Sequence, residues 1–383
     1  MTNVPVKGNV LRWARKFRGL DEEQAAKRLG ISVRDLLGYE NEDREPTITL
    51  FEKFSAQYQL PQATLFLENP PETPSDPTDF RTLGSRDSGG HTFDFKVALS
   101  TIRTWLFQLE RVVADDEEFV PPTLPTVSFS EDPGQAGERE RRRIGVSVQE
   151  QLSWTQQEAF GRWRAHLENV GVYVFQAKFP VSDGRGFSLY ESKNSPTVVI
   201  NKDEASDLAK CFTLWHEYCH LLLRKPGVSD HGRGNSVEQF CNRFAAAFLL
   251  PTDALREILP VWPNNPVAWD PSDIDRWARR LKMSRIVLAL RLEHMRLAPN
   301  GFSNQFRWDV KPTRKIQGER GPDFTKIRLS ELGFSFTRQI MGAVERGAID
   351  TVQAVEALGI APDSFNKARE YVARRQAMVE GVE

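Results

Sequence analysis

The chain has 383 residues, 40% of them hydrophobic and 27% charged, and its formal net charge at pH 7 is −1. This length and composition predict two or three folded domains, and the near-neutral charge excludes a protein that binds its partners as a polycation or polyanion. No apolar stretch approaches the ~18 residues of a membrane helix, and the start lacks a signal-like region. Since the three cysteines also suit a reducing compartment, we expect a cytoplasmic protein with no membrane partner.

The first 69 residues contain the pattern of two short helices joined by a tight turn. Residues 24–31 read QAAKRLGI, in which the small residues and the glycine are what such a turn requires. Ser32 is a polar start for a second helix, which we expect over about 33–39. The pattern resembles the helix-turn-helix of the Cro/repressor (XRE) family, and this resemblance implies that the second helix enters the major groove of double-stranded DNA.

The charge of this module bears on DNA binding, because phosphate contacts dominate affinity. Residues 1–69 carry ten basic and ten acidic side chains, so this module would bind DNA only weakly unless its basic side chains are segregated from the acidic ones. Several of them cluster early, and we expect Lys27 and Arg28 to contact phosphates and Arg34 to read a base. Modules of this kind often pair on two-fold operators, so we also expect a homodimer. A protein-docking or dimerising role is the alternative.

The middle of the chain alternates breaks with regular elements. A proline-rich stretch cannot form a helix and predicts a linker over 70–78. An amphipathic helical region is expected over 79–113, and strands over 170–175 and 196–201. We interpret the charge run ERERRR at 138–143 as a solvated helix face rather than a nucleic-acid site.

The next helical stretch contains the run HEYCH at 216–220, with two histidines four residues apart. Residues at i and i+4 lie on one helix face, so His216 and His220 can bind a single metal ion. Glu217 can then accept a proton from the attacking water, as in helical zinc hydrolases that cleave peptide bonds. Two buried histidines with ordinary hydrogen-bond partners are the alternative.

A catalytic zinc site needs three protein ligands and one open position. Glu238 is the best candidate for the third ligand. It opens a strongly helical segment whose apolar positions mark one buried face, and Glu238 stands near that face. His231, in a glycine-bearing loop, is the competitor; it could instead stabilise an oxyanion. The third histidine of the extended zinc-binding pattern would fall at Pro226, so that class is excluded.

Residues 170–251 resemble the ImmA/IrrE family of metallo-endopeptidases. The matching elements are RGFSL at 185–189, the helix that carries HEYCH, and the pattern ExxCNxFAAxFLLP at 238–251. The family often has glycine where this chain has Cys219, whose thiol we interpret as packing rather than as a fourth ligand.

This resemblance implies a zinc site and its chemistry. His216, His220 and Glu238 would hold Zn²⁺, and Glu217 would be the general base. The resemblance also implies a small mixed α/β, gluzincin-like domain. The substrate it implies is a regulatory protein, often a repressor of the helix-turn-helix class.

The C-terminal part is expected to be helical. Residues 353–360, QAVEALGI, repeat the pattern of QAAKRLGI, and we interpret the tail as a docking or regulatory bundle rather than a second DNA reader. The prediction is therefore an α+β, mainly helical protein. Its expected parts are a helix-turn-helix domain (1–69), a linker (70–78), a zinc peptidase domain with a small sheet (79–300) and a C-terminal helical region (301–383).

These patterns favour a zinc-dependent endopeptidase that regulates transcription by cleaving a repressor-like protein. Its partners would be that protein substrate and double-stranded DNA. The alternative is a non-catalytic DNA-binding repressor or antitoxin whose zinc domain acts as a sensor.

Overall fold

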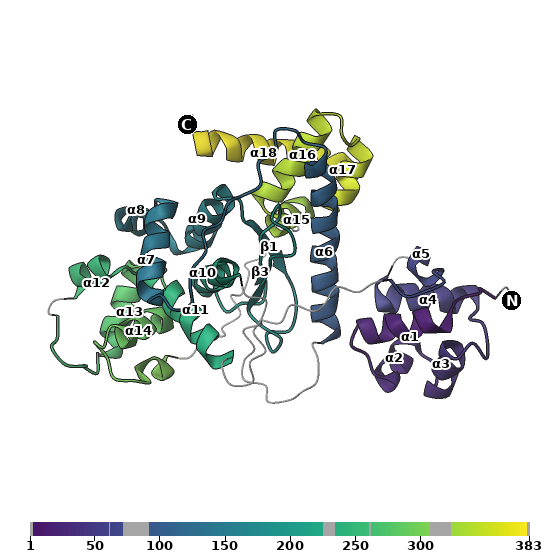
Figure 1. Ribbon diagram of the computed structural model, residues 1–383, viewed down its shortest axis with the longest axis horizontal. Coiled ribbons are helices and arrows are strands. Elements are labelled where there is room, and N and C mark those ends of the chain that lie inside the picture. The colour runs from purple at the N-terminus through teal and green to yellow at the C-terminus, as the bar shows by residue number, and fades with distance from the viewer. Residues whose placement is uncertain are drawn as a thin grey trace. The chain divides into compact units, whose positions relative to one another are not determined.

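The computed structural model shows a mainly helical chain with one three-stranded sheet, so the predicted α+β class is confirmed (Figure 1). The chain forms two compact units. The first is built from the described parts of residues 1–76, 84–103 and 178–183, and the second from the rest. None of the described helices is both long enough and apolar enough to cross a membrane. The structure describes residues 3–60, 62–71, 92–224, 234–259, 262–306 and 323–380.

The N-terminal part of the first unit contains the predicted pair of helices. Its helices are α1 (Gly8–Phe17), α2 (Glu22–Leu29), α3 (Val33–Glu40), α4 (Ile48–Tyr58) and α5 (Gln62–Leu65). Asp21 and Gln24 form a reciprocal capping box at the start of α2, and Gly30 ends this helix with a φ of 71°. Ser32 caps α3, so the helix expected over 33–39 is confirmed.

Two basic residues of the early cluster are not available to phosphates. Arg15 is buried and donates to both carboxylate oxygens of Glu40, at 2.7 and 2.9 Å. Arg18 is also buried and donates to the carbonyls of Tyr58 and Gln59 at the end of α4, and burial lowers the pKa of its guanidinium to about 10. These two arginines hold the bundle together, so the basic surface is smaller than the sequence suggested.

The sheet of the second unit has the strand order β1–β3–β2. β1 (Tyr173–Ala177) runs parallel to β3 (Thr197–Asn201), and β2 (Gly186–Leu189) runs antiparallel to it. The β-branched sequence TVVIN suits the central position of β3, which is buried along its whole length. β2 therefore lies at one edge of the sheet.

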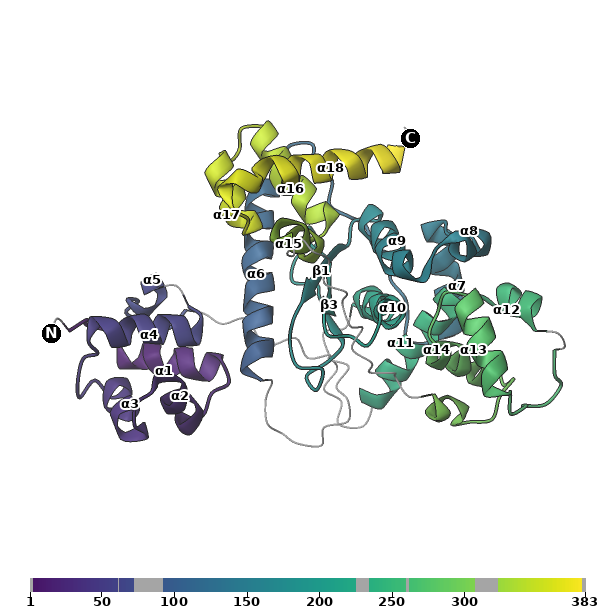
Figure 2. The ribbon, with the colours of Figure 1, turned by 180° about the vertical axis from the view of Figure 1, so that it is seen from behind.

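Helices surround this sheet (Figures 1 and 2). α10 packs against β2 and β3, while the Phe175 ring on β1 packs against Trp105 of α6 and Phe336 of α16. The remaining described helices are α6 (Phe93–Ala114), α7 (Pro133–Ile144), α8 (Val148–Ser153), α9 (Gln156–Asn169), α10 (Asp207–Leu223), α11 (Gly234–Leu249), α12 (Thr252–Ile258), α13 (Pro271–Arg280), α14 (Arg285–His294), α15 (Phe324–Leu332), α16 (Phe334–Glu345), α17 (Thr351–Leu358) and α18 (Phe365–Glu380), with short 3₁₀ turns at Phe302–Gln305 and Pro362–Ser364. Of the helical region expected over 79–113, residues 79–91 lie outside the described chain.

The charge run at 138–143 lies on α7 and is not a solvated face throughout, so that interpretation was wrong for two of its residues. Glu140 and Arg141 are 1% and 3% exposed. Arg141 donates to the carbonyl of Phe248, at 2.9 Å, and to that of Leu249, where α11 ends. A buried guanidinium thus satisfies carbonyls that a helix end leaves without intrahelical partners.

The C-terminal helices α15–α18 belong to the same compact unit as the sheet, so no unit boundary falls at the expected position 300. Gly333, with a φ of 83°, joins α15 to α16 where the chain passes α9. A Cβ there would lie 2.4 Å from atoms of both Arg164 and Glu168, so only glycine permits this approach. α17 repeats the caps of α2, with an Asp350–Gln353 capping box and Gly359 at a φ of 59°.

Candidate metal centre

Helix α10 presents the HEYCH residues from a buried position. Ser206 caps its first turn, and nearly all its residues from 209 to 223 are buried. On its rear side the rings of Trp215 and Phe248 stack with centroids 3.7 Å apart, and the Tyr218 hydroxyl donates to Glu140 at 3.2 Å. This packing fixes the rotation of the helix and hence the direction of its opposite face.

Three side chains from α10 and α11 converge at that face. His216 Nε2 lies 3.2 Å from His220 Nε2. Glu238 of α11 places its carboxylate oxygens 3.1 Å from His216 Nε2 and 3.3 Å from His220 Nε2. His216 is fully buried, whereas the Glu238 side chain is 28% exposed, so the cluster opens on the side of α11.

The spacing of these atoms fits a tetrahedral zinc ion. Ligand atoms about 2.0–2.1 Å from a tetrahedral ion lie roughly 3.3–3.4 Å apart, close to the separations observed here. Two imidazole nitrogens and one carboxylate oxygen are also ligand types that zinc accepts, and they leave a fourth position open. His216, His220 and Glu238 form the one group of three or more potential ligands within the described residues. The described residues therefore include three potential ligands whose types and spacing match those of catalytic zinc sites.

The electrostatics of the cluster also favour a cation. Burial alone would raise the pKa of Glu238, but the two imidazoles facing it hold that pKa far below its usual range. Burial opposes protonation of His220, yet Cys241 and Glu238 raise the pKa of its imidazole well above the ordinary value. Glu238 is therefore ionised beside the two imidazoles, so its carboxylate oxygens are available as ligands for a divalent ion.

A fourth residue orients the first histidine. Asn242 Oδ1 lies 3.1 Å from His216 Nδ1, so Nδ1 can donate and Nε2 is left to bind a metal. The sequence prediction did not assign a role to Asn242. The signal was present, because residues 238 and 242 are four apart and share one face of α11.

Glu217 of α10 lies next to the edge strand β2. Its side chain is fully buried. At Gly186 of β2, an added Cβ would lie 3.3 Å from Glu217 Cγ and 2.7 Å from the Thr213 methyl. A glycine is therefore needed for β2 to pass this close to the helix.

A buried ion pair holds β2 against α10. Arg185, which precedes β2, pairs with Glu204, and both side chains are almost fully buried. The second oxygen of Glu204 accepts a hydrogen bond of 3.0 Å from the Thr213 hydroxyl, one helical turn before Glu217. The neighbouring residues Arg185 and Gly186 thus have separate structural roles: Arg185 forms the ion pair, and Gly186 allows β2 to approach α10 closely.

The remaining predicted residues of this region are placed as follows. His231 lies outside the described residues, so its expected role stays a prediction. Cys219 is fully buried and contacts Cys241 rather than joining the ligand cluster. The thiol therefore packs between α10 and α11.

The expected DNA-binding residues lie on the first unit. Lys27 and Arg28 are exposed in the last turn of α2, and Arg34 is exposed in the first turn of α3. The Arg28 guanidinium lies 4.0 Å from the centroid of the Phe93 ring, a contact that would compete with a phosphate. DNA contacts by these three residues remain predictions.

Comparison with known proteins agrees with this arrangement. Residues 167–293 match the family model described as the IrrE N-terminal-like domain, Peptidase M78. Residues 11–61 match a helix-turn-helix family model. Neither a curated protein nor a solved structure matched the chain. The matched segments contain the three-residue cluster and the α2–α3 pair, respectively. The chain thus carries an IrrE N-terminal-like domain of the Peptidase M78 family behind an N-terminal helix-turn-helix domain, as the resemblance to ImmA/IrrE proteins implied.

Proposed function

We propose that the protein is a zinc-dependent endopeptidase that regulates transcription by cleaving a repressor-like protein. The observation that carries this proposal is the convergence of His216, His220 and Glu238 within 3.1–3.3 Å of one another, next to Glu217. The proposal includes a cytoplasmic location and a homodimer.

The residues of the centre have separate tasks. His216, His220 and Glu238 would hold Zn²⁺, which when bound supplies a Lewis acid and lowers the pKa of water towards neutrality. Glu217 accepts the proton of the attacking water and returns it to the leaving amine. Asn242 keeps His216 in the tautomer that binds through Nε2.

The edge strand offers a place for the substrate backbone. β2 has β3 on one side and no strand partner on the other among the described residues. An extended peptide can add to such an edge through main-chain hydrogen bonds. Since β2 passes beside Glu217 at Gly186, a peptide paired with β2 would run past the general base.

The helix-turn-helix domain gives the proposed peptidase a second partner. We propose that it binds double-stranded DNA, with Lys27 and Arg28 on phosphates and Arg34 on a base edge. DNA binding would hold the peptidase near regulators that share the same operator.

The test compares wild-type protein with Glu217→Gln. Both are expressed in cells, and the new protein N-termini of each proteome are identified by mass spectrometry. We expect at least one regulatory protein to be cut only by the wild type, because loss of a general base lowers rates by roughly 10²–10⁴-fold. Both proteins should contain equal zinc, since this substitution leaves the three ligands in place.

The non-catalytic alternative makes the opposite prediction. If the zinc domain is only a sensor, the two proteomes carry the same N-termini while DNA binding persists in both proteins. Zinc loss in Glu217→Gln protein would also remove support for the division of tasks proposed here.

A further inference from the structure

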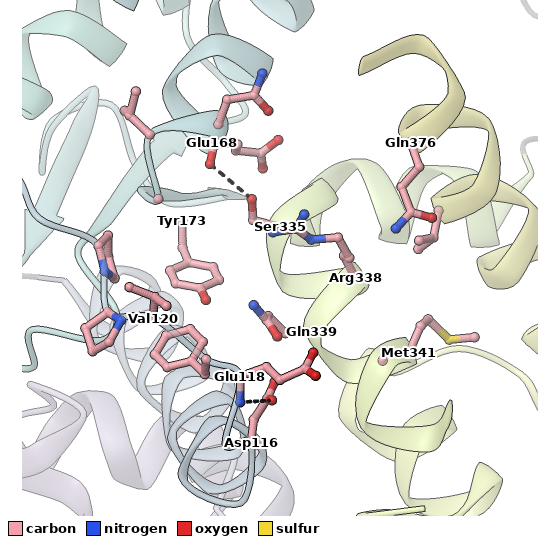
Figure 3. A pocket seen from close by; sticks show the side chains of 18 of the residues that line it. Asp116, Glu118, Val120, Glu168, Tyr173, Ser335, Arg338, Gln339, Met341 and Gln376 are labelled. Atoms are coloured by element: carbon pink, nitrogen blue, oxygen red, sulfur yellow. Dashed lines mark hydrogen bonds between the residues drawn. The ribbon is translucent and has the colours of Figure 1, made fainter. Parts of the chain in front are cut away.

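The second unit contains a large hollow that is separate from the metal centre (Figure 3). It is a cavity of about 830 Å³ between the loop after α6, the turn from α9 to β1, and helices α16 and α18. None of its described lining residues is a predicted metal ligand or the general base. This volume suits a ligand the size of a short peptide or a drug-like molecule.

Charges of both signs line opposite sides of this cavity. Figure 3 shows Asp116 and Glu118 on the side of the loop after α6, and Arg338 on the side of α16. Asp116 already pairs with Arg346 at 2.9 Å. Within the described chain, no ion pair occupies the exposed side chains of Glu118 and Arg338, although the Arg338 guanidinium lies 5.6 Å from the centroid of the Phe334 ring. A ligand can therefore meet the Glu118 carboxylate on one side and the Arg338 guanidinium on the other.

Neutral polar groups add donors and acceptors. The amides of Gln339 and Gln376 line the cavity, together with the Ser335 hydroxyl (Figure 3). These groups can exchange hydrogen bonds with the backbone of a ligand.

Part of the cavity lining is apolar. Phe119, Val120 and two prolines lie on the loop after α6, and Met341 lies on α16. Val120 is 81% exposed, the highest value among the exposed large hydrophobic residues of the described chain. An apolar side chain of a ligand would remove this surface from water.

One residue that lines the cavity also bonds to α10, the helix that carries Glu217. Arg143 lines it, and its guanidinium donates to Glu140, at 2.7 Å, and to the Tyr218 hydroxyl. Tyr218 follows Glu217 in the sequence. An occupant of the cavity would therefore lie beside a side chain that anchors α10.

We propose that this cavity binds a short peptide segment that carries one basic and one acidic group around an apolar side chain. The basic group would face Glu118, the acidic group Arg338, and the backbone amides the glutamine side chains. A simple anion or cation would leave one charged side without a partner, whereas a peptide can contact the charged, the neutral polar and the apolar residues that line the cavity. The site is separate from the metal centre, so it stands whether or not the chain hydrolyses peptides.

The test uses N-acetyl-lysyl-valyl-glutamate amide, which carries one basic and one acidic group, and isothermal titration calorimetry on zinc-loaded Glu217→Gln protein, which would not consume the probe. We expect binding that Arg338→Gln and Glu118→Gln each weaken about tenfold, because each removes a charge-assisted contact. Arg374→Gln is the control, since Arg374 is exposed on α18 and does not line the cavity.

The pairing of charges is tested with altered peptides. The blocked lysyl-valyl-glutamine peptide should bind the parent protein about tenfold more weakly than the glutamate peptide does, whereas Arg338→Gln protein should bind both peptides equally. Binding of the blocked peptide shows that the site accepts an internal segment of a protein; if only unblocked lysyl-valyl-glutamate binds, it accepts free peptides. Absence of binding at millimolar peptide, or equal binding by all variants, would overturn the proposal. Neither result depends on whether the wild type cleaves a substrate.

Discussion

A single amide orients the buried imidazole of His216. Asn242 meets its Nδ1 at 3.1 Å, and the other nitrogen faces His220 and Glu238. Partners of this kind, one layer behind a metal ligand, typically contribute 10–100-fold to metal affinity. Asn242→Ala should therefore weaken zinc binding by about 10–100-fold, measured by competition with a chromophoric chelator.

Two substitutions serve as controls for this prediction. Asn242→Asp keeps an acceptor at the same place and should retain most of the affinity. Arg243→Ala changes an exposed neighbour on the same helix and should leave zinc binding unaltered. Equal affinity of Asn242→Ala and wild-type protein would show that the amide does not orient the ligand.

The sequence predicted the residues of the centre to different extents. The i, i+4 spacing of His216 and His220 fixes their common face, because helix geometry alone determines it. The position of Glu238 depends on how α11 packs against α10. Sequence spacing could therefore only make it a candidate, and the family motif supported the choice. The Arg185–Glu204 pair is held by tertiary packing across 19 residues, and no local pattern predicts such a contact.

At the level of elements, a buried guanidinium joins α7 to the end of α11. Arg141 donates to the carbonyls of Phe248 and Leu249 and to two carbonyls that follow α7. Arg141→Met would keep much of the volume but leave these carbonyls buried without partners. We expect a loss of about 3 kcal/mol in the free energy of unfolding, measured by urea denaturation.

The same helix supplies the control for this substitution. Arg142 is exposed, so Arg142→Met should change stability by less than about 0.5 kcal/mol. If the two variants are equally stable, Arg141 does not cap α11. This arginine also explains why the charge run was misread, since its acceptors lie 107 and 108 residues away in the sequence.

Element boundaries were predicted best where local chemistry sets them. The α2–α3 turn follows from Asp21, Gly30 and Ser32, whose capping roles depend on neighbours only three residues away. The arrangement of the C-terminal helices was not predictable in this way. At Gly333, between α15 and α16, the chain passes so close to α9 that a Cβ would clash with Arg164 and Glu168. Both residues lie far away in the sequence, so no local pattern predicts this contact.

At the level of the whole molecule, the helix-turn-helix and the metal cluster belong to different compact units. All three candidate ligands lie in the second unit, and Lys27, Arg28 and Arg34 lie in the first. Removal of zinc should therefore stop cleavage and leave DNA affinity within about twofold of its original value, since coupling between sites requires a differential contact. The measurements are fluorescence anisotropy with operator DNA and cleavage of the identified substrate, before and after chelation.

His220→Ala provides the genetic equivalent of chelation, and Glu217→Gln retains zinc but lacks the base. All three proteins should bind DNA alike, whereas only the zinc-loaded wild type should cleave. A tenfold change in DNA affinity on zinc removal, together with no cleavage by the wild type, would instead identify the zinc domain as a sensor. These two readouts separate the enzyme from the sensor, because cleavage requires Glu217, whereas a zinc-dependent change in DNA affinity requires only the three ligands.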